Sequence, residues 1–134
     1  MNGGVSAPPT LMKIQKNIAW IRPFLLSVKT LVPLNKINRI NGYSVPPGKS
    51  ENAYASITRV STRKCNINIK LTSNENQKPI FLAALLENLA HEMAHLVVWE
   101  HTHKHFALQA RILTRFSKVL KKAGIKNTYA RIKI

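Results

Sequence analysis

The fold of this chain is decided by residues 85–95, which read LLENLAHEMAH. The leucines recur at three- and four-residue spacings, so a helix is predicted over residues 79–99. Residues four apart lie one above the other on a helix, so His91 and His95 project from the same face. This HExxH pattern is typical of a tetrahedral zinc site. Glu92 is predicted to be the catalytic base that takes a proton from the zinc-bound water.

A third zinc ligand is expected in the turn that follows this helix. All five histidines lie between residues 91 and 105, and the chain must turn after Trp99 for a later one to reach the metal. His101 is the favoured ligand and His103 is the alternative, while His105 and Glu100 are further candidates.

The remaining sequence indicates an α+β fold. A helix is predicted over residues 10–29, although Pro23 would kink or split it. Residues 33–52 contain three prolines and two glycines and are expected to form a long loop. Two strands are predicted at residues 53–60 and 66–71. They are expected to form a small antiparallel sheet that packs on the HExxH helix.

A last helix is predicted over residues 104–122, with Gly124 as its C-cap. Its inward face is expected to hold Phe106, Ala110, Leu113, Phe116 and Leu120. A length of 134 residues favours one domain, which we place at residues 10–123. A flexible tail is expected at residues 1–9 and a basic C-terminal tail at residues 124–134.

The composition excludes several classes of enzyme. The chain has 21 basic residues, five glutamates and no aspartate, and its net charge is +16. A Ser-His-Asp triad or a carboxylate-rich magnesium site would need acids that are missing here. The single cysteine excludes a disulfide framework. No signal peptide or membrane span is evident, so we expect an intracellular protein without a membrane partner.

The strong positive charge predicts contact with nucleic acid. Within the last helix the basic residues form one narrow stripe opposite the expected apolar face, and no acid follows Glu100. A solvated helix face normally mixes charges of both signs, so a wholly basic stripe favours phosphate contact. The candidate nucleic-acid-binding residues are Lys104, Arg111, Arg115, Lys118 and Lys122.

Two strands, the HExxH helix, a histidine-rich turn and Phe106 together resemble the SprT-like zinc metallopeptidases and the related WLM-type minimal peptidases. The resemblance covers roughly residues 53–120. These families usually place the ligand histidine four residues before a phenylalanine, a position that Thr102 occupies relative to Phe106. If Phe106 instead matches the aromatic residue that follows that phenylalanine, His101 is the ligand and His105 replaces the phenylalanine.

The resemblance implies a minimal zincin-like fold with zinc at the edge of the sheet. It also implies proteolysis, in some members of proteins crosslinked to DNA. The leading hypothesis is therefore a zinc-dependent metallopeptidase acting on protein or peptide substrates, some of them bound to DNA. The alternative is an inactive zinc-site protein that binds nucleic acid or serves in an assembly, and zinc-dependent hydrolysis of a non-peptide amide is a third hypothesis. The strand at residues 66–71 is the expected docking edge for an extended substrate.

Overall fold

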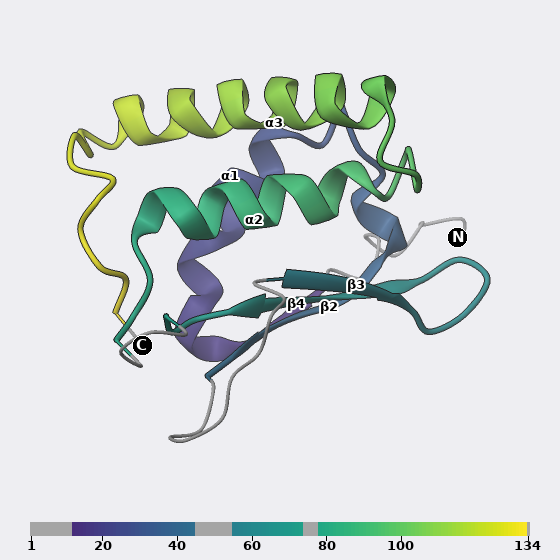
Figure 1. Cartoon of the computed structure of the whole chain (residues 1–134), viewed down its shortest axis with the longest axis horizontal. Helices are drawn as coiled ribbons and strands as arrows, with labels where there is room; N and C mark the ends of the chain where they lie inside the picture. The colour runs from purple at the N-terminus through teal and green to yellow at the C-terminus, as the bar shows by residue number, and fades with distance from the viewer. Residues whose placement is uncertain (1–11, 45–54, 74–77, 134) are drawn as a thin grey trace, which may run out of the picture.

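The structure is a computed structural model that describes residues 12–44, 55–73 and 78–133. A four-stranded sheet lies on one side, helix α2 (Leu82–Ala94) packs above it, and helix α3 (His103–Lys122) packs on α2 (Figure 1). Helix α1 (Arg22–Ser27) contacts α3. The α+β class predicted from the sequence is confirmed. The expected tail at residues 1–9 lies outside the described residues.

The sheet is mixed, whereas a purely antiparallel sheet was predicted from the sequence. Its strand order is β1 (Lys13–Ile14), β2 (Ile37–Tyr43), β4 (Cys65–Lys70) and β3 (Ala55–Arg59). Only β3 and β4 are antiparallel, whereas β1 pairs with β2, and β2 with β4, in parallel. The prediction of an antiparallel sheet was wrong because it lacked β1 and β2, the strands that form the parallel pairs. The two predicted strands, joined by a short turn, form an antiparallel hairpin.

The sheet is buried on the face toward α2. Ile37, Ile40, Ile67 and Ile69 of β2 and β4 are at most 1% exposed. The alternate positions carry asparagines that pair across the strands, with Asn38 bonded to Asn66 at 2.9 Å. This one-sided pattern fixes the register, because a shift by one residue would bury the asparagines.

The predicted helix over residues 10–29 is wrong in its extent. In the described part, β1 is followed by a 3-10 helix at Lys16–Ile21 and then by α1. Ile18 has φ −119° and ψ 17°, which interrupts the helical backbone. Pro23 lies in the first turn of α1, where its missing N–H is tolerated.

The long loop predicted at residues 33–52 contains a 3-10 helix (Leu34–Lys36) and strand β2, while residues 45–54 lie outside the described part. The strand was missed because its register shifts between Ile37 and Arg39. The shift places the buried residues Ile37 and Ile40 three apart, which hides the two-residue alternation of a strand.

Helix α2 ends earlier than predicted, at Ala94. The amide N–H of His95 bonds to the carbonyl of Glu92 at 3.1 Å, and a tight turn follows. At the N-terminal end of α2, residues 128–132, the C-terminal segment, fold back on the helix. The N–H groups of Leu82 and Ala83 donate to the carbonyls of Ala130 and Thr128 at 3.0 and 2.8 Å. These carbonyls satisfy helix-end donors that have no partner within the helix.

The predicted inward face of helix α3 is confirmed for Phe116 and Leu120, which are buried, and for Leu113, which packs against the core. It is wrong for the first two turns of the helix. Phe106 is 53% exposed and Ala110 is also exposed. The apolar pattern placed Phe106 inward because the buried set begins with a histidine, which was not counted as apolar. The buried residues are His105, Leu108, Ile112, Phe116 and Leu120. Gly124 ends the helix with φ +74°, and the N–H of Ile125 bonds to the Leu120 carbonyl, as expected for a glycine C-cap. None of the described helices is long and apolar enough to cross a membrane.

Candidate metal centre

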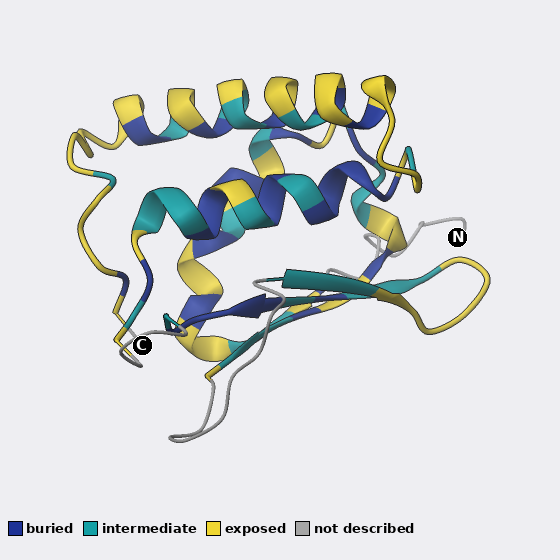
Figure 2. Cartoon of the chain, viewed as in Figure 1, coloured by how far each residue is buried: buried dark blue, intermediate teal, exposed yellow. Residues whose placement is uncertain are grey.

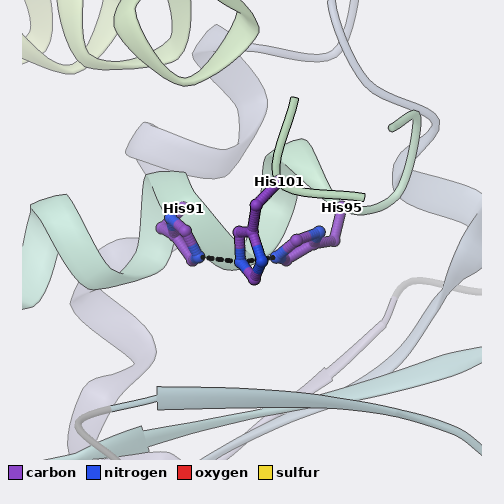
Figure 3. A group of neighbouring side chains, drawn as sticks. All are labelled: His91, His95 and His101. Carbon is purple, nitrogen blue, oxygen red and sulfur yellow. Dashed lines mark hydrogen bonds between the residues drawn. The ribbon is translucent and has the colours of Figure 1, made fainter. Parts of the chain in front are cut away.

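Three histidines meet where α2 ends and the following turn folds back. His91 and His95 project from α2, and His101 reaches them from the turn (Figure 3). The Nε2 atom of His101 lies 3.0 Å from Nε2 of His91 and 3.2 Å from Nε2 of His95. The early end of α2 makes this possible, because a helix continuing to residue 99 would carry His101 away from the pair.

The other ring nitrogens have acceptors that fix the rings. His91 Nδ1 lies 2.9 Å from Oε1 of Gln109 on α3, and His95 Nδ1 lies 3.2 Å from the carbonyl of Val98. Both Nδ1 atoms therefore donate, which leaves the Nε2 lone pairs of His91 and His95 directed at His101. Sequence reasoning missed Gln109 and Val98, although a ligand histidine generally needs such an acceptor.

This donor set fits a metal ion. His101 Nε2 carries at most one hydrogen, so at most one of its two contacts can be an N–H···N hydrogen bond. A cation between the three nitrogens would satisfy all of the lone pairs. Tetrahedral zinc with ligands at about 2.0–2.1 Å places its nitrogens about 3.3 Å apart, close to the observed spacing. His91, His95 and His101 are thus positioned to bind a metal ion.

The carboxyl group of Glu92 lies beside this set and is almost inaccessible to solvent. Glu92 is 5% exposed, and its Oε2 has no hydrogen-bond partner among the described residues. Burial raises the pKa of Glu92 to about 7, although the charge of His101 lowers it. A carboxyl group with this pKa can both accept and release a proton near neutral pH.

His105 and His103 occupy different places. His105 is fully buried, with its ring centroid 4.1 Å from that of His95 and 4.5 Å from that of His91. Its Nε2–H donates to the His91 carbonyl at 3.0 Å, and burial lowers its pKa, so the ring is neutral. His103 is exposed at the start of α3 and is not part of the histidine group.

A cleft of about 560 Å³ lies between the histidine group and the sheet. Ala55 and Ile57 of β3 line it, together with Asn88 of α2 and Trp99 of the turn. The strand at this edge is β3, because β4 pairs on both sides with β2 and β3. The expectation that the strand at residues 66–71 receives the substrate is therefore wrong: β4 has no free edge. Asn88 was not singled out from the sequence.

A tyrosine hydroxyl can serve as an oxyanion partner, but no tyrosine is among the described residues that line the cleft. Tyr129 is 74% exposed and packs against Phe81, before the first turn of α2. Tyr43 ends β2, and Tyr54 falls outside the described residues.

The candidate nucleic-acid residues of α3 divide into two groups. Arg115 is half-buried and donates to the Ser27 carbonyl at 3.3 Å and to Thr30 Oγ1 at 3.5 Å. The other four are exposed: Lys104, Arg111, Lys118 and Lys122. The exposed residues of α3 lie mainly on its side away from α2 (Figure 2). The stripe was predicted to lie opposite the apolar face of α3. It instead borders the buried face, which begins with His105 and Leu108, so Arg115 reaches the C-terminal end of α1.

Comparison with solved structures shows what the fold is similar to. A crystal structure of a Wss1 mutant from Saccharomyces cerevisiae matches with a TM-score of 0.59 at 11% identity, covering 90% of this chain and 100% of that chain. Wss1 itself matches with a TM-score of 0.54 at 10% identity, covering 88% and 97%. No protein-family model and no curated protein sequence matches the chain. The chain is therefore a small α+β protein with the fold of Wss1 and a histidine group suited to a metal.

Proposed function

We propose that this protein is a zinc-dependent peptidase, with His91, His95 and His101 as the metal ligands. The observation that carries the proposal is a buried carboxyl group, Glu92, in the same cleft as three converging imidazole nitrogens. A purely structural zinc site would not need such a group, since structural sites are closed by four protein ligands. The HExxH pattern and the fold shared with Wss1 support the same class.

Each part of the cleft has its own role in the proposed peptide hydrolysis. Zinc at this site supplies Lewis acidity, which lowers the pKa of water and polarises a carbonyl. Glu92 takes the proton of the attacking water and delivers it to the leaving amine, consistent with its raised pKa of about 7. An extended peptide binds alongside the outer edge of β3, whose backbone groups hold it across the cleft. Asn88 lines the cleft, and its side-chain amide donates to a substrate oxygen in this proposal.

We further propose that α3 holds the enzyme on nucleic acid, so that its substrates include DNA-associated proteins. The net charge of +16 and the four exposed cations of the stripe support this proposal. Such contacts would be made to phosphates and would carry no sequence specificity.

The decisive experiment compares the purified protein with its Glu92→Gln, His101→Ala and His103→Ala variants for zinc content and casein cleavage. We expect one zinc in the wild type, Glu92→Gln and His103→Ala, and loss of zinc in His101→Ala. Cleavage should fall by about 10²-fold or more in Glu92→Gln, the usual contribution of a general base. His103→Ala, whose side chain lies outside the group, should stay active.

The remaining outcomes separate the hypotheses. Stoichiometric zinc without cleavage, with or without single-stranded DNA, would favour an inactive zinc-site protein that binds nucleic acid. A wild type without zinc would refute the proposal. Loss of zinc in His103→Ala with retention in His101→Ala would move the third ligand to His103.

A further inference from the structure

A second, smaller pocket adjoins the metal cleft. It has a volume of about 210 Å³ and lies at the turn, residues 60–64, that joins β3 to β4. His95 and Trp99 line both spaces, so the pocket shares a wall with the metal centre. The proposed mechanism makes no use of this pocket.

The pocket is strongly cationic. Its described lining contains no carboxylate but includes the four basic residues Lys36, Arg59, Arg63 and Lys64. Lys64 Nζ donates to the Asn35 carbonyl at 2.6 Å, and the Arg59 guanidinium lies 4.2 Å from the ring centroid of Trp99. Both contacts hold a cation in place against an uncharged partner, so its positive charge is not neutralised. Such a site favours an anionic ligand.

The position of the pocket relative to β3 indicates what the anion belongs to. Side chains two apart along a strand lie on the same face, and Ala55 and Ile57 line the metal cleft. Arg59 is the next residue on that face and lines the cationic pocket. A peptide extended along the edge of β3 from the cleft therefore leads to Arg59 and the pocket. The volume suits one side chain.

We propose that this pocket is a specificity subsite that binds an acidic side chain, aspartate or glutamate, of the peptide substrate. The inference rests on the proposed peptidase function and adds a substrate class to it. A peptide is favoured over a nucleic-acid strand because the pocket is small and shares a wall with the metal centre. The exposed stripe of α3 offers a polynucleotide a more open surface.

The test uses the zinc-loaded full chain and pairs of internally quenched peptides that differ only by aspartate or asparagine at one position. The varied position is moved stepwise along the peptide, and kcat/KM is measured. We expect a preference for aspartate of about two- to fivefold at one position, the size of one partly exposed charge pair. Arg63→Glu should abolish or reverse it. Lys29→Glu, an equal charge change at an exposed site outside both pockets, should retain it.

Binding separates this inference from the peptidase proposal. Fluorescence anisotropy would measure the affinity of labelled aspartate and asparagine peptides for the Glu92→Gln protein. One outcome is that the zinc-loaded protein cleaves no peptide, while the aspartate peptide binds more tightly than the asparagine peptide and Arg63→Glu removes this difference. That outcome supports the subsite and contradicts the peptidase proposal. Cleavage without any aspartate preference overturns the subsite. Weaker binding of a single-stranded oligonucleotide to Arg63→Glu, without any aspartate preference in the wild type, would assign the pocket to phosphate instead.

Discussion

Gln109 is a side chain of α3 that contacts the histidine group directly. Its Oε1 accepts from His91 Nδ1 at 2.9 Å, which holds the imidazole with its Nε2 lone pair toward His101. We expect Gln109→Ala to weaken zinc binding by about 10- to 100-fold, the usual effect of losing such an acceptor. Competition against a chelating zinc indicator would measure the change.

Gln109→Glu is the matched control for this prediction. It keeps an acceptor for His91 Nδ1 and adds a negative charge, so zinc affinity should be retained or increased. Equal zinc affinity in wild type and Gln109→Ala would show that the contact does not orient His91.

The sequence predicted those residues of the histidine group that lie close to one another along the chain. His91 and His95 form a pair through helical spacing alone. His101 required a turn whose course the sequence leaves open, and Gln109 lies 18 residues from His91 on another helix. Its contact depends on how α2 and α3 pack, which is a property of the tertiary structure.

Strand β2 was also missed because tertiary packing, and not local sequence, determines its structure. Gly42 contributed to the prediction of a loop, yet it lies within β2. A Cβ atom built there would come 2.8 Å from Cγ of the buried Leu71, so the position excludes a side chain for reasons of packing. Helices α2 and α3 were located because each has a long periodic pattern. Strand β1 and helix α1 are short, and β2 lacks the two-residue alternation of a half-buried strand.

This explanation predicts that Gly42→Ala destabilises the protein by about 1–3 kcal/mol through overpacking. Urea unfolding followed by circular dichroism would measure the loss. In a Leu71→Ala background the clash is absent, so the same change should cost much less than in the wild type. Additive effects of the two substitutions would show that Leu71 is not the reason for the glycine.

At the scale of the whole molecule, the two ends of α2 depend on distant parts of the chain. The His91 carbonyl, close to the end of α2, accepts from the buried ring of His105, and the C-terminal segment caps its start. Metal binding would join His101 of the turn to the two histidines of α2. Ligands that bind only the folded state stabilise it, by about 2.7 kcal/mol at 100 times Kd. We expect zinc to raise Tm in the wild type and EDTA to reverse this, with no effect of zinc in His101→Ala.

The net charge of +16 is the property of the whole molecule that most directly predicts a partner. If the exposed stripe binds phosphates, the affinity for single-stranded DNA should fall linearly with the logarithm of the salt concentration. Each phosphate contact contributes about 0.7 to the slope. Arg111→Gln should therefore reduce the slope by about that amount, in titrations followed by fluorescence anisotropy.

Arg115→Gln is the control within the same stripe. Arg115 donates to Ser27 and Thr30, so its guanidinium is held at the C-terminal end of α1 and is less free to contact phosphate. Arg115→Gln should lower the stability to urea and leave the salt dependence of DNA affinity nearly unchanged. Arg111→Gln should reduce the salt dependence and leave the stability unchanged. A slope unchanged by both substitutions would place the nucleic-acid contact, if any, on another face. A larger loss of slope in Arg115→Gln would mean that this side chain leaves α1 to bind DNA.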